Sequence, residues 1–271
     1  MVRDITIGQY FPGNSLLHRM DPRIKIVLTL IFIFVIFFCK NFWALGLMAL
    51  FLFGGICISG VPFKMLLKSL RAILLIIIIT AVLNIFYITD GNTLFKAGFI
   101  EVTDKGVFTA LFMAVRLSCL IIGSSLMTYT TTPTMLTDAI ERLLSPLKIF
   151  KIQVHTLAMM MTLALRFIPT LIEEIDKIMN AQKARGADLE SGNLIDRAKA
   201  LVPVLVPLFV SSFRRAYELA FAMECRCYTG NKDRTRMKQM KFSYLDIIFV
   251  FGETVLITGI VLLNHYFTHL I

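Results

Sequence analysis

The 271-residue sequence has little charge and few polar stretches. Only 17% of its residues are Asp, Glu, Lys or Arg, and 57% are hydrophobic, whereas a soluble domain carries about 25% charged and roughly 45–50% apolar residues. This balance excludes an ordinary soluble globular domain and a disordered chain. Cysteine is also scarce, with five residues, which excludes a disulfide-built scaffold and predicts reduced thiols.

Motifs for chemistry are missing as well. The sequence contains no G-x-x-x-x-G-K-[ST], no H-E-x-x-H, no G-x-S-x-G and no Cys/His set with metal-ligand spacing. We therefore predict no nucleotide hydrolysis by this chain, no catalytic residue, no cofactor and no metal site. The basic run 232–241 lacks the interleaved aromatic residues of a single-strand binding surface, so no nucleic acid partner is expected.

What the sequence does contain is long apolar runs. The first, residues 26–59, would measure about 51 Å as one helix, against a hydrocarbon core of roughly 30 Å. It must turn, and Lys40-Asn41 is its polar break. Treating the other runs in the same way predicts five membrane spans, at about 24–40, 42–60, 72–88, 107–129 and 244–267.

The basic residues orient these spans. If the N-terminus is cytoplasmic, 24 of the 28 Lys and Arg lie inside, three lie outside (Lys40, Lys96 and Lys105), and Arg116 lies within a span. Cytoplasmic loops carry such an excess. The sequence therefore predicts a multi-pass membrane protein with a cytoplasmic N-terminus and with the bilayer as one of its partners.

Two ionisable side chains fall inside the predicted spans. Arg116 and Glu253 each lie about ten residues into a span, so both are expected near mid-membrane. A lone charge there costs roughly 2.5–3.5 kcal/mol on insertion scales. We therefore predict an intramembrane ion pair between Arg116 and Glu253, with Asn84 as a candidate third member and a role in stabilising the fold rather than in transport.

The chain between spans four and five is long and amphipathic. Thr132-Pro133 is typical of a helix start, and Ser145-Pro146 ends that short helix. A second helix, apolar at 155–165, ends at Ala184-Arg185-Gly186, where the glycine suits the position after the helix. Residues 194–228 repeat this plan, with apolar residues at 201–210 and Cys225-Arg226-Cys227 at the far end.

The predicted fold is an all-α membrane protein of about five transmembrane helices, with a long amphipathic cytoplasmic coupling domain inserted between spans four and five. The predicted domains are 1–130, with the first four spans, 131–242, with the coupling helices, and 243–271, with the last span.

Two interpretations of the paired arginines are open from the residues alone. The planar guanidinium fork suits carboxylates and helix C-termini of another protein, so two such helix ends suggest two similar sockets on a partner. Alternatively, each arginine caps the C-terminus of its own helix through the helix dipole.

Several segments resemble the transmembrane T components of energy-coupling factor transporters, of the type shared among vitamin systems. The resemblance covers the whole chain and is carried by Gly8–Ser15, Leu17–Lys25, Ala181–Ala187 and Glu218–Gly230. It implies a non-catalytic membrane scaffold of a bacterial ABC-type importer. Its partners would be two cytosolic ATPases and one membrane-embedded, substrate-binding S component.

The resemblance also implies roles for individual residues. The family's paired Ala-Arg-Gly motifs contact the ATPases. Here Ala184, Arg185 and Gly186 match the first motif, whereas Cys225, Arg226 and Cys227 keep only the arginine of the second. Cys227 lacks the freedom of glycine at positive φ, which puts the local geometry in question. The apolar parts of both helices would press on the S component, through Met159, Met160, Met161, Leu205 and Phe209.

Two alternatives remain at this stage. The same family includes dedicated cobalt, nickel or biotin importers. A stand-alone membrane enzyme or channel is a different class, but it would need more polar residues converging in the spans than Arg116, Glu253 and Asn84.

Overall fold

The computed structural model describes residues 10–88, 93–97, 100–150, 153–187, 193–228, 230 and 242–266. They fall into two compact units. The bundle unit contains residues 10–139 and 242–266, and the arm unit contains residues 140–230. The boundary lies inside one short helix, so each unit is described separately below.

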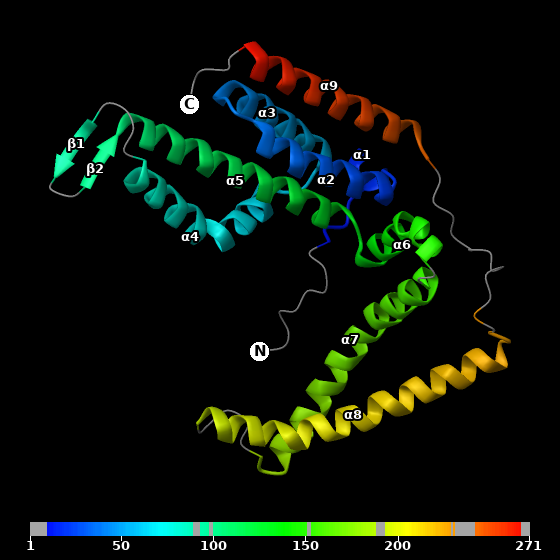
Figure 1. The fold of residues 1–271 in the computed structure, drawn as a ribbon. Helices are drawn as coiled ribbons and strands as arrows, with labels where there is room; N and C mark the ends of the chain where they lie inside the picture. The colour runs from blue at the N-terminus through cyan, green and yellow to red at the C-terminus, as the bar shows by residue number, and fades with distance from the viewer. Residues whose placement is uncertain are drawn as a thin grey trace. The chain divides into compact units, whose positions relative to one another are not determined.

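The bundle unit begins with a short helix, α1 (Leu16–Arg19), and four long ones: α2 (Pro22–Phe38), α3 (Phe42–Ser59), α4 (Phe63–Tyr87) and α5 (Asp104–Thr130). Helix α6 (Pro133–Leu143) starts in this unit, and α9 (Tyr244–Tyr266) completes it. In Figure 1, α4 runs beside α5, and α9 lies against α2 and α3. The last span of the sequence therefore packs with the first two.

Local signals set the helix boundaries. The Asp21 carboxylate caps α2 by accepting a hydrogen bond from the backbone N–H of Arg23 at 2.9 Å, and Pro22 occupies the first helical position. The Thr103 hydroxyl accepts from Gly106 N–H at the start of α5. Helix α6 starts at Pro133 and ends at Leu143, which confirms the predicted short helix.

The core of the bundle is apolar and closely packed. Ile36, Leu45, Met48 and Ile260 are almost completely buried and bring α2, α3 and α9 together. Helices α2 and α5 approach closely at Gly123, where a Cβ atom would lie only 2.5 Å from the Phe32 ring. A glycine is therefore required for this packing.

A short antiparallel hairpin separates α4 from α5. Its strands are β1 (Thr93–Ala97) and β2 (Ile100–Thr103), with Lys96 paired to Glu101. The sequence predicts no strand here, because the segment carries no alternating apolar pattern of useful length. The hairpin does not change the fold class, and the predicted all-α membrane architecture is confirmed.

All five predicted spans fall on helices, but their bounds differ from prediction. Helix α4 starts nine residues before the predicted 72–88, at Phe63, so Lys64, Lys68 and Arg71 lie in its first turns. Among the described residues, six helices are long and apolar enough to cross a membrane. These are α3, α4, α5 and α9, together with α7 (Val154–Ala184) and α8 (Leu194–Cys225) of the arm unit. Helix α2 matches span one and has 17 residues.

The arm unit consists mainly of α7 and α8, after a 3₁₀ turn, η1 (Ser145–Phe150). Both helices contain proline: Pro169 in α7, and Pro203 and Pro207 in α8. They cross in Figure 1. Among their described side chains, only Val154, Ala158 and Val204 are buried.

Candidate docking site

Three polar contacts show how α7 and α8 pair. The Tyr228 hydroxyl donates to the Met159 sulfur at 2.9 Å, Arg215 Nη2 donates to a Glu174 carboxylate oxygen at 3.1 Å, and the Gln182 side-chain amide donates to the Pro203 carbonyl at 3.2 Å. The N-terminal part of α7 thus contacts the C-terminal end of α8, and the C-terminal part of α7 contacts the N-terminal part of α8. The two helices are therefore antiparallel.

The C-terminus of α7 is a complete Schellman motif. Gly186 has φ +88°, its N–H donates to the Lys183 carbonyl at 3.0 Å, and the Ala187 N–H donates to the Gln182 carbonyl at 3.0 Å. These bonds satisfy carbonyls that a helix end otherwise leaves open. The prediction that this helix ends at Ala184-Arg185-Gly186 is confirmed.

The C-terminus of α8 has the same geometry with different residues. Cys227 takes the glycine position with φ +54°, its N–H donates to the Glu224 carbonyl at 2.8 Å, and the Tyr228 N–H donates to the Met223 carbonyl at 3.0 Å. The local geometry that the cysteine put in question is therefore retained. Among the described residues, Cys227 is the only non-glycine residue with a positive φ. This conformation carries a strain of about 1 kcal/mol or more.

Arg185 and Arg226 occupy equivalent positions, as the residue that ends each helix. Both side chains are exposed. In the described part of the chain, no hydrogen bond or ion pair reaches either guanidinium, and the nearby helix carbonyls accept from backbone N–H groups instead. Direct hydrogen bonding of each arginine to its own helix end is therefore not observed.

Counted along the chain, the two arginines are also equidistant from one contact between the helices. Arg185 follows Glu174 by 11 residues and Arg226 follows Arg215 by 11 residues, and Glu174 and Arg215 contact each other. Eleven residues correspond to about 16 Å along each axis, and the axes run in opposite directions. The arginine-bearing turns thus lie at opposite ends of the helix pair, on the order of 30 Å apart.

The residues predicted to meet an S component lie on the same two helices. Met160, Met161, Leu205 and Phe209 are exposed; Phe209 is 67% accessible, and its ring centroid lies 4.9 Å from that of Phe213, with the two rings tilted. Met159 is half-buried because its sulfur accepts the Tyr228 hydroxyl. Four of the five residues are therefore available on the arm surface, and Met159 joins the two helices.

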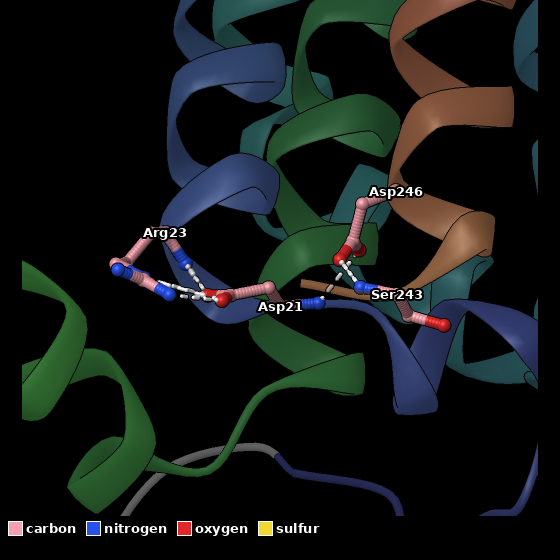
Figure 2. Close-up of polar contacts among 4 residues, drawn as sticks. All are labelled: Asp21, Arg23, Ser243 and Asp246. Carbon is pink, nitrogen blue, oxygen red and sulfur yellow. Dashed lines mark hydrogen bonds and ion pairs between the residues drawn. The ribbon is translucent and has the colours of Figure 1, made fainter. Parts of the chain in front are cut away.

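In the bundle unit, a polar cluster joins the first and last long helices (Figure 2). The Asp246 carboxylate, only 1% exposed, accepts from the backbone N–H of Asp21 at 2.9 Å and of Ser243 at 2.8 Å. Arg23 forms an ion pair with Asp21 at 2.6 Å and stacks over the Phe242 ring at 4.7 Å. Sequence reasoning missed this contact, because 225 residues separate Asp21 from Asp246.

The N-terminal segment also holds the end of α5. The Lys25 ammonium group is buried and donates to the Thr130 carbonyl at 3.1 Å and to the Thr131 hydroxyl at 3.0 Å. The Phe11 N–H donates to the Tyr129 carbonyl at 2.9 Å. The opening segment that carries the resemblance thus fixes the point where the chain leaves the bundle toward α6.

The predicted ion pair between Arg116 and Glu253 is not formed. Arg116 donates to the Cys39 carbonyl, at the C-terminal end of α2, and lies 4.5 Å over the Phe112 ring. Glu253 instead lines a cavity with Lys25, toward the other end of α2, and its Oε1 has no hydrogen-bond partner. Lys25 and Cys39 are 14 residues apart, or about 20 Å along a helix.

Asn84 does not join Arg116 and Glu253 either, because its side chain donates to the Thr80 carbonyl of its own helix. Counting residues from each span end placed both charges near mid-membrane, but it gave no information on how the helices are staggered.

Within the described ranges, no three His, Cys, Asp or Glu side chains gather as a metal site would require.

The fold and these sites define a multi-pass helical membrane protein. Its sequence matches the family model described as "Cobalt transport protein" over residues 13–237. It is 53% identical over 267 residues to the energy-coupling factor transporter transmembrane protein of Ruminiclostridium cellulolyticum, covering 98% of this chain and all of the relative.

Proteins of the same name show similar agreement. The one from Clostridium kluyveri is 55% identical over 249 residues, with 92% of each chain covered. The one from Bacillus subtilis is 45% identical over 246 residues, covering 91% of this chain and 93% of the relative. The chain therefore belongs to the energy-coupling factor transporter transmembrane protein family, and the resemblance predicted from the sequence is confirmed.

Proposed function

We propose that this chain is the non-catalytic scaffold of an energy-coupling factor importer, in which Arg185 and Arg226 dock two cytosolic ATPases. The observation that carries the proposal is the pair of equivalent helix ends, each with an exposed arginine and a Schellman motif. Two equivalent arginine-bearing turns at opposite ends of the helix pair suit two similar sockets, as a pair of ATPases would provide.

Each docking turn has three residues in this proposal: Ala184, Arg185 and Gly186 on α7, and Cys225, Arg226 and Cys227 on α8. The side chain that enters the socket is the arginine, whose five donors suit carboxylates and helix ends. Cys225 and Cys227 are exposed, and both are small enough to leave the guanidinium accessible. The turn that ends α8 therefore docks in the same way as the turn that ends α7.

The arm also transmits motion. ATP binding draws the two ATPases together and moves both arginines, and the long helices α7 and α8 carry the displacement to their apolar parts. There Met160, Met161, Leu205 and Phe209 contact a membrane-embedded S component, which reorients and releases its substrate. Met159 keeps the helices in register by accepting the Tyr228 hydroxyl.

The proposed topology has a cytoplasmic N-terminus, with residues 131–242 acting as the coupling domain. This orientation follows the positive-inside distribution of Lys and Arg. The first turns of α4 agree with it, because Lys64, Lys68 and Arg71 gather at the end of α4 that would face the cytoplasm.

The substrate class proposed is a vitamin, recognised by the S component. A second candidate is cobalt or nickel uptake, favoured by the description of the matching family model. Uptake of radiolabelled vitamins and of cobalt by cells with and without this chain would separate the two candidates.

Affinity purification of the tagged chain from native membranes, followed by mass spectrometry, tests the proposal. We expect two ATPase chains and at least one small hydrophobic protein at near-stoichiometric amounts. Recovery of the chain alone, under detergent conditions that preserve other ABC transporters, would contradict it.

A further inference from the structure

A cavity of about 280 Å³, partly open to the surface, is formed by the bundle unit. Its walls come from α1, α2, α3, α5 and α9, and most of the lining side chains are Leu, Ile, Met or Phe. Three glycines, Gly54, Gly55 and Gly123, contribute to the space by leaving no side chain in it. For comparison, an engineered apolar cavity of about 150 Å³ binds benzene. This cavity is therefore large enough for a small organic molecule.

Among the residues that line the cavity, Glu253 stands out. Only 4% of the residue is exposed, and its Oε1 is buried without a hydrogen-bond partner. In the described chain, no hydrogen bond or ion pair reaches its carboxyl group. A buried acid in this state is costly unless a partner satisfies it.

The other polar side chains of the wall are already satisfied. Lys25 donates to the Thr130 carbonyl and the Thr131 hydroxyl, at the negative end of the α5 dipole. Thr29 donates its hydroxyl to the Lys25 carbonyl at 2.7 Å. The Lys25 charge is therefore compensated locally, and Glu253 remains as the group that a ligand would complement.

We propose that this cavity is a ligand site for a small amphipathic amine, whose apolar body fills the space and whose ammonium group donates to Glu253. The apolar walls exclude a strongly polar ligand, and an ammonium group complements the carboxylate in charge and in hydrogen bonding. The site is independent of the docking arginines, because every residue that lines it belongs to the bundle unit.

The test uses 2-phenylethylamine as the probe and 2-phenylethanol as its uncharged analogue. The purified full-length chain, with its exposed Cys57, Cys225 and Cys227 blocked beforehand, is unfolded thermally in detergent with a thiol-reactive dye, which then reports exposure of the buried Cys39 and Cys119. A ligand that binds the folded state raises the unfolding temperature in a saturable way, and this gives its affinity. Each variant is compared with its own ligand-free sample.

We expect Glu253→Gln to bind the amine about tenfold more weakly, the loss of one charge-assisted hydrogen bond, and to bind the alcohol as wild type does. Glu218→Gln, at an exposed position of α8, is the matched control and should leave both probes unaffected. Gly54→Leu should weaken both probes, because a Cβ at Gly54 meets no atom within 4 Å and the larger side chain fills the space.

Three results would overturn the proposal. One is equal amine affinity for wild type and Glu253→Gln. Another is unchanged binding to Gly54→Leu, which would place the probe elsewhere. The third is the absence of any saturable shift, which would leave the cavity to water or lipid.

Discussion

The bundle unit and the arm unit hold their helices together in different ways. In the bundle, buried polar groups such as Asp246 and Lys25, 1% and 6% exposed, join segments more than 100 residues apart. In the arm, the ion pair between Glu174 and Arg215 is about 30% exposed on both sides, and few side chains are buried. The bundle is therefore stabilised from within, whereas the arm leaves its apolar surface for lipid or other proteins.

This contrast fits the proposed role of the chain as a force-transmitting scaffold. A scaffold that transmits force needs a frame that does not deform and a lever whose surfaces are free to bind. The bundle has buried contacts that hold its helices in fixed positions, as a rigid frame requires. The arm has two exposed arginines and an exposed apolar surface on two long helices, which are the features of a lever.

The largest effect on stability is expected at Asp246. Asp246→Ala leaves the buried N–H group of Asp21 and the half-buried N–H group of Ser243 without an acceptor, which should lower the free energy of unfolding by about 3–5 kcal/mol. Thermal unfolding of the detergent-purified chain measures this. Asp246→Asn keeps one acceptor and should be intermediate, and a wild-type unfolding temperature for the alanine variant would refute the role of this cluster.

A smaller effect is expected at Lys25. Lys25→Met keeps the apolar stem but removes the hydrogen bonds to Thr130 and Thr131, so we expect a loss of about 2–3 kcal/mol in the same unfolding assay. Lys68→Met, which removes an exposed lysine of α4, is the control and should have little effect. If both variants unfold alike, Lys25 does not hold the end of α5.

Cys227 offers a change in the opposite direction. Cys227→Gly removes the strain of a side chain at φ +54° and should stabilise the end of α8 by about 1 kcal/mol. Hydrogen exchange of the amides at Tyr228 and Cys227 would report it. Faster exchange in the glycine variant would show that the cysteine side chain makes a favourable contact there.

The smallest effect is expected at the arm ion pair. Because Glu174 and Arg215 are partly solvated, a double-mutant cycle with Glu174→Gln and Arg215→Met should give a coupling of about 1 kcal/mol or less. A coupling as large as the effect of Asp246→Ala would remove the distinction between frame and lever.

The sequence predicted most of the elements and few of the long-range contacts. Apolar runs gave the spans, and Thr132-Pro133 and Gly186 gave helix boundaries, because these signals act within a few residues. The Asp21–Asp246 contact and the stagger that keeps Arg116 away from Glu253 depend on tertiary packing. No local pattern contains that information.

The start of α4 shows the same limit. Lys64, Lys68 and Arg71 made residues 63–71 look like a loop, yet they lie in the first turns of a 25-residue helix. Long basic side chains can reach the membrane surface from within a helix. Hydropathy alone therefore places the span but not the helix end.

The central claim is that the arm docks two ATPases through its arginines. Its most direct test is the amount of ATPase recovered with the tagged chain when both arginines are reversed. We predict that Arg185→Glu with Arg226→Glu abolishes recovery of the ATPases and leaves the chain folded, while Arg214→Glu, an exposed arginine of α8, recovers them normally. Wild-type recovery of both ATPases by the double variant would contradict the account.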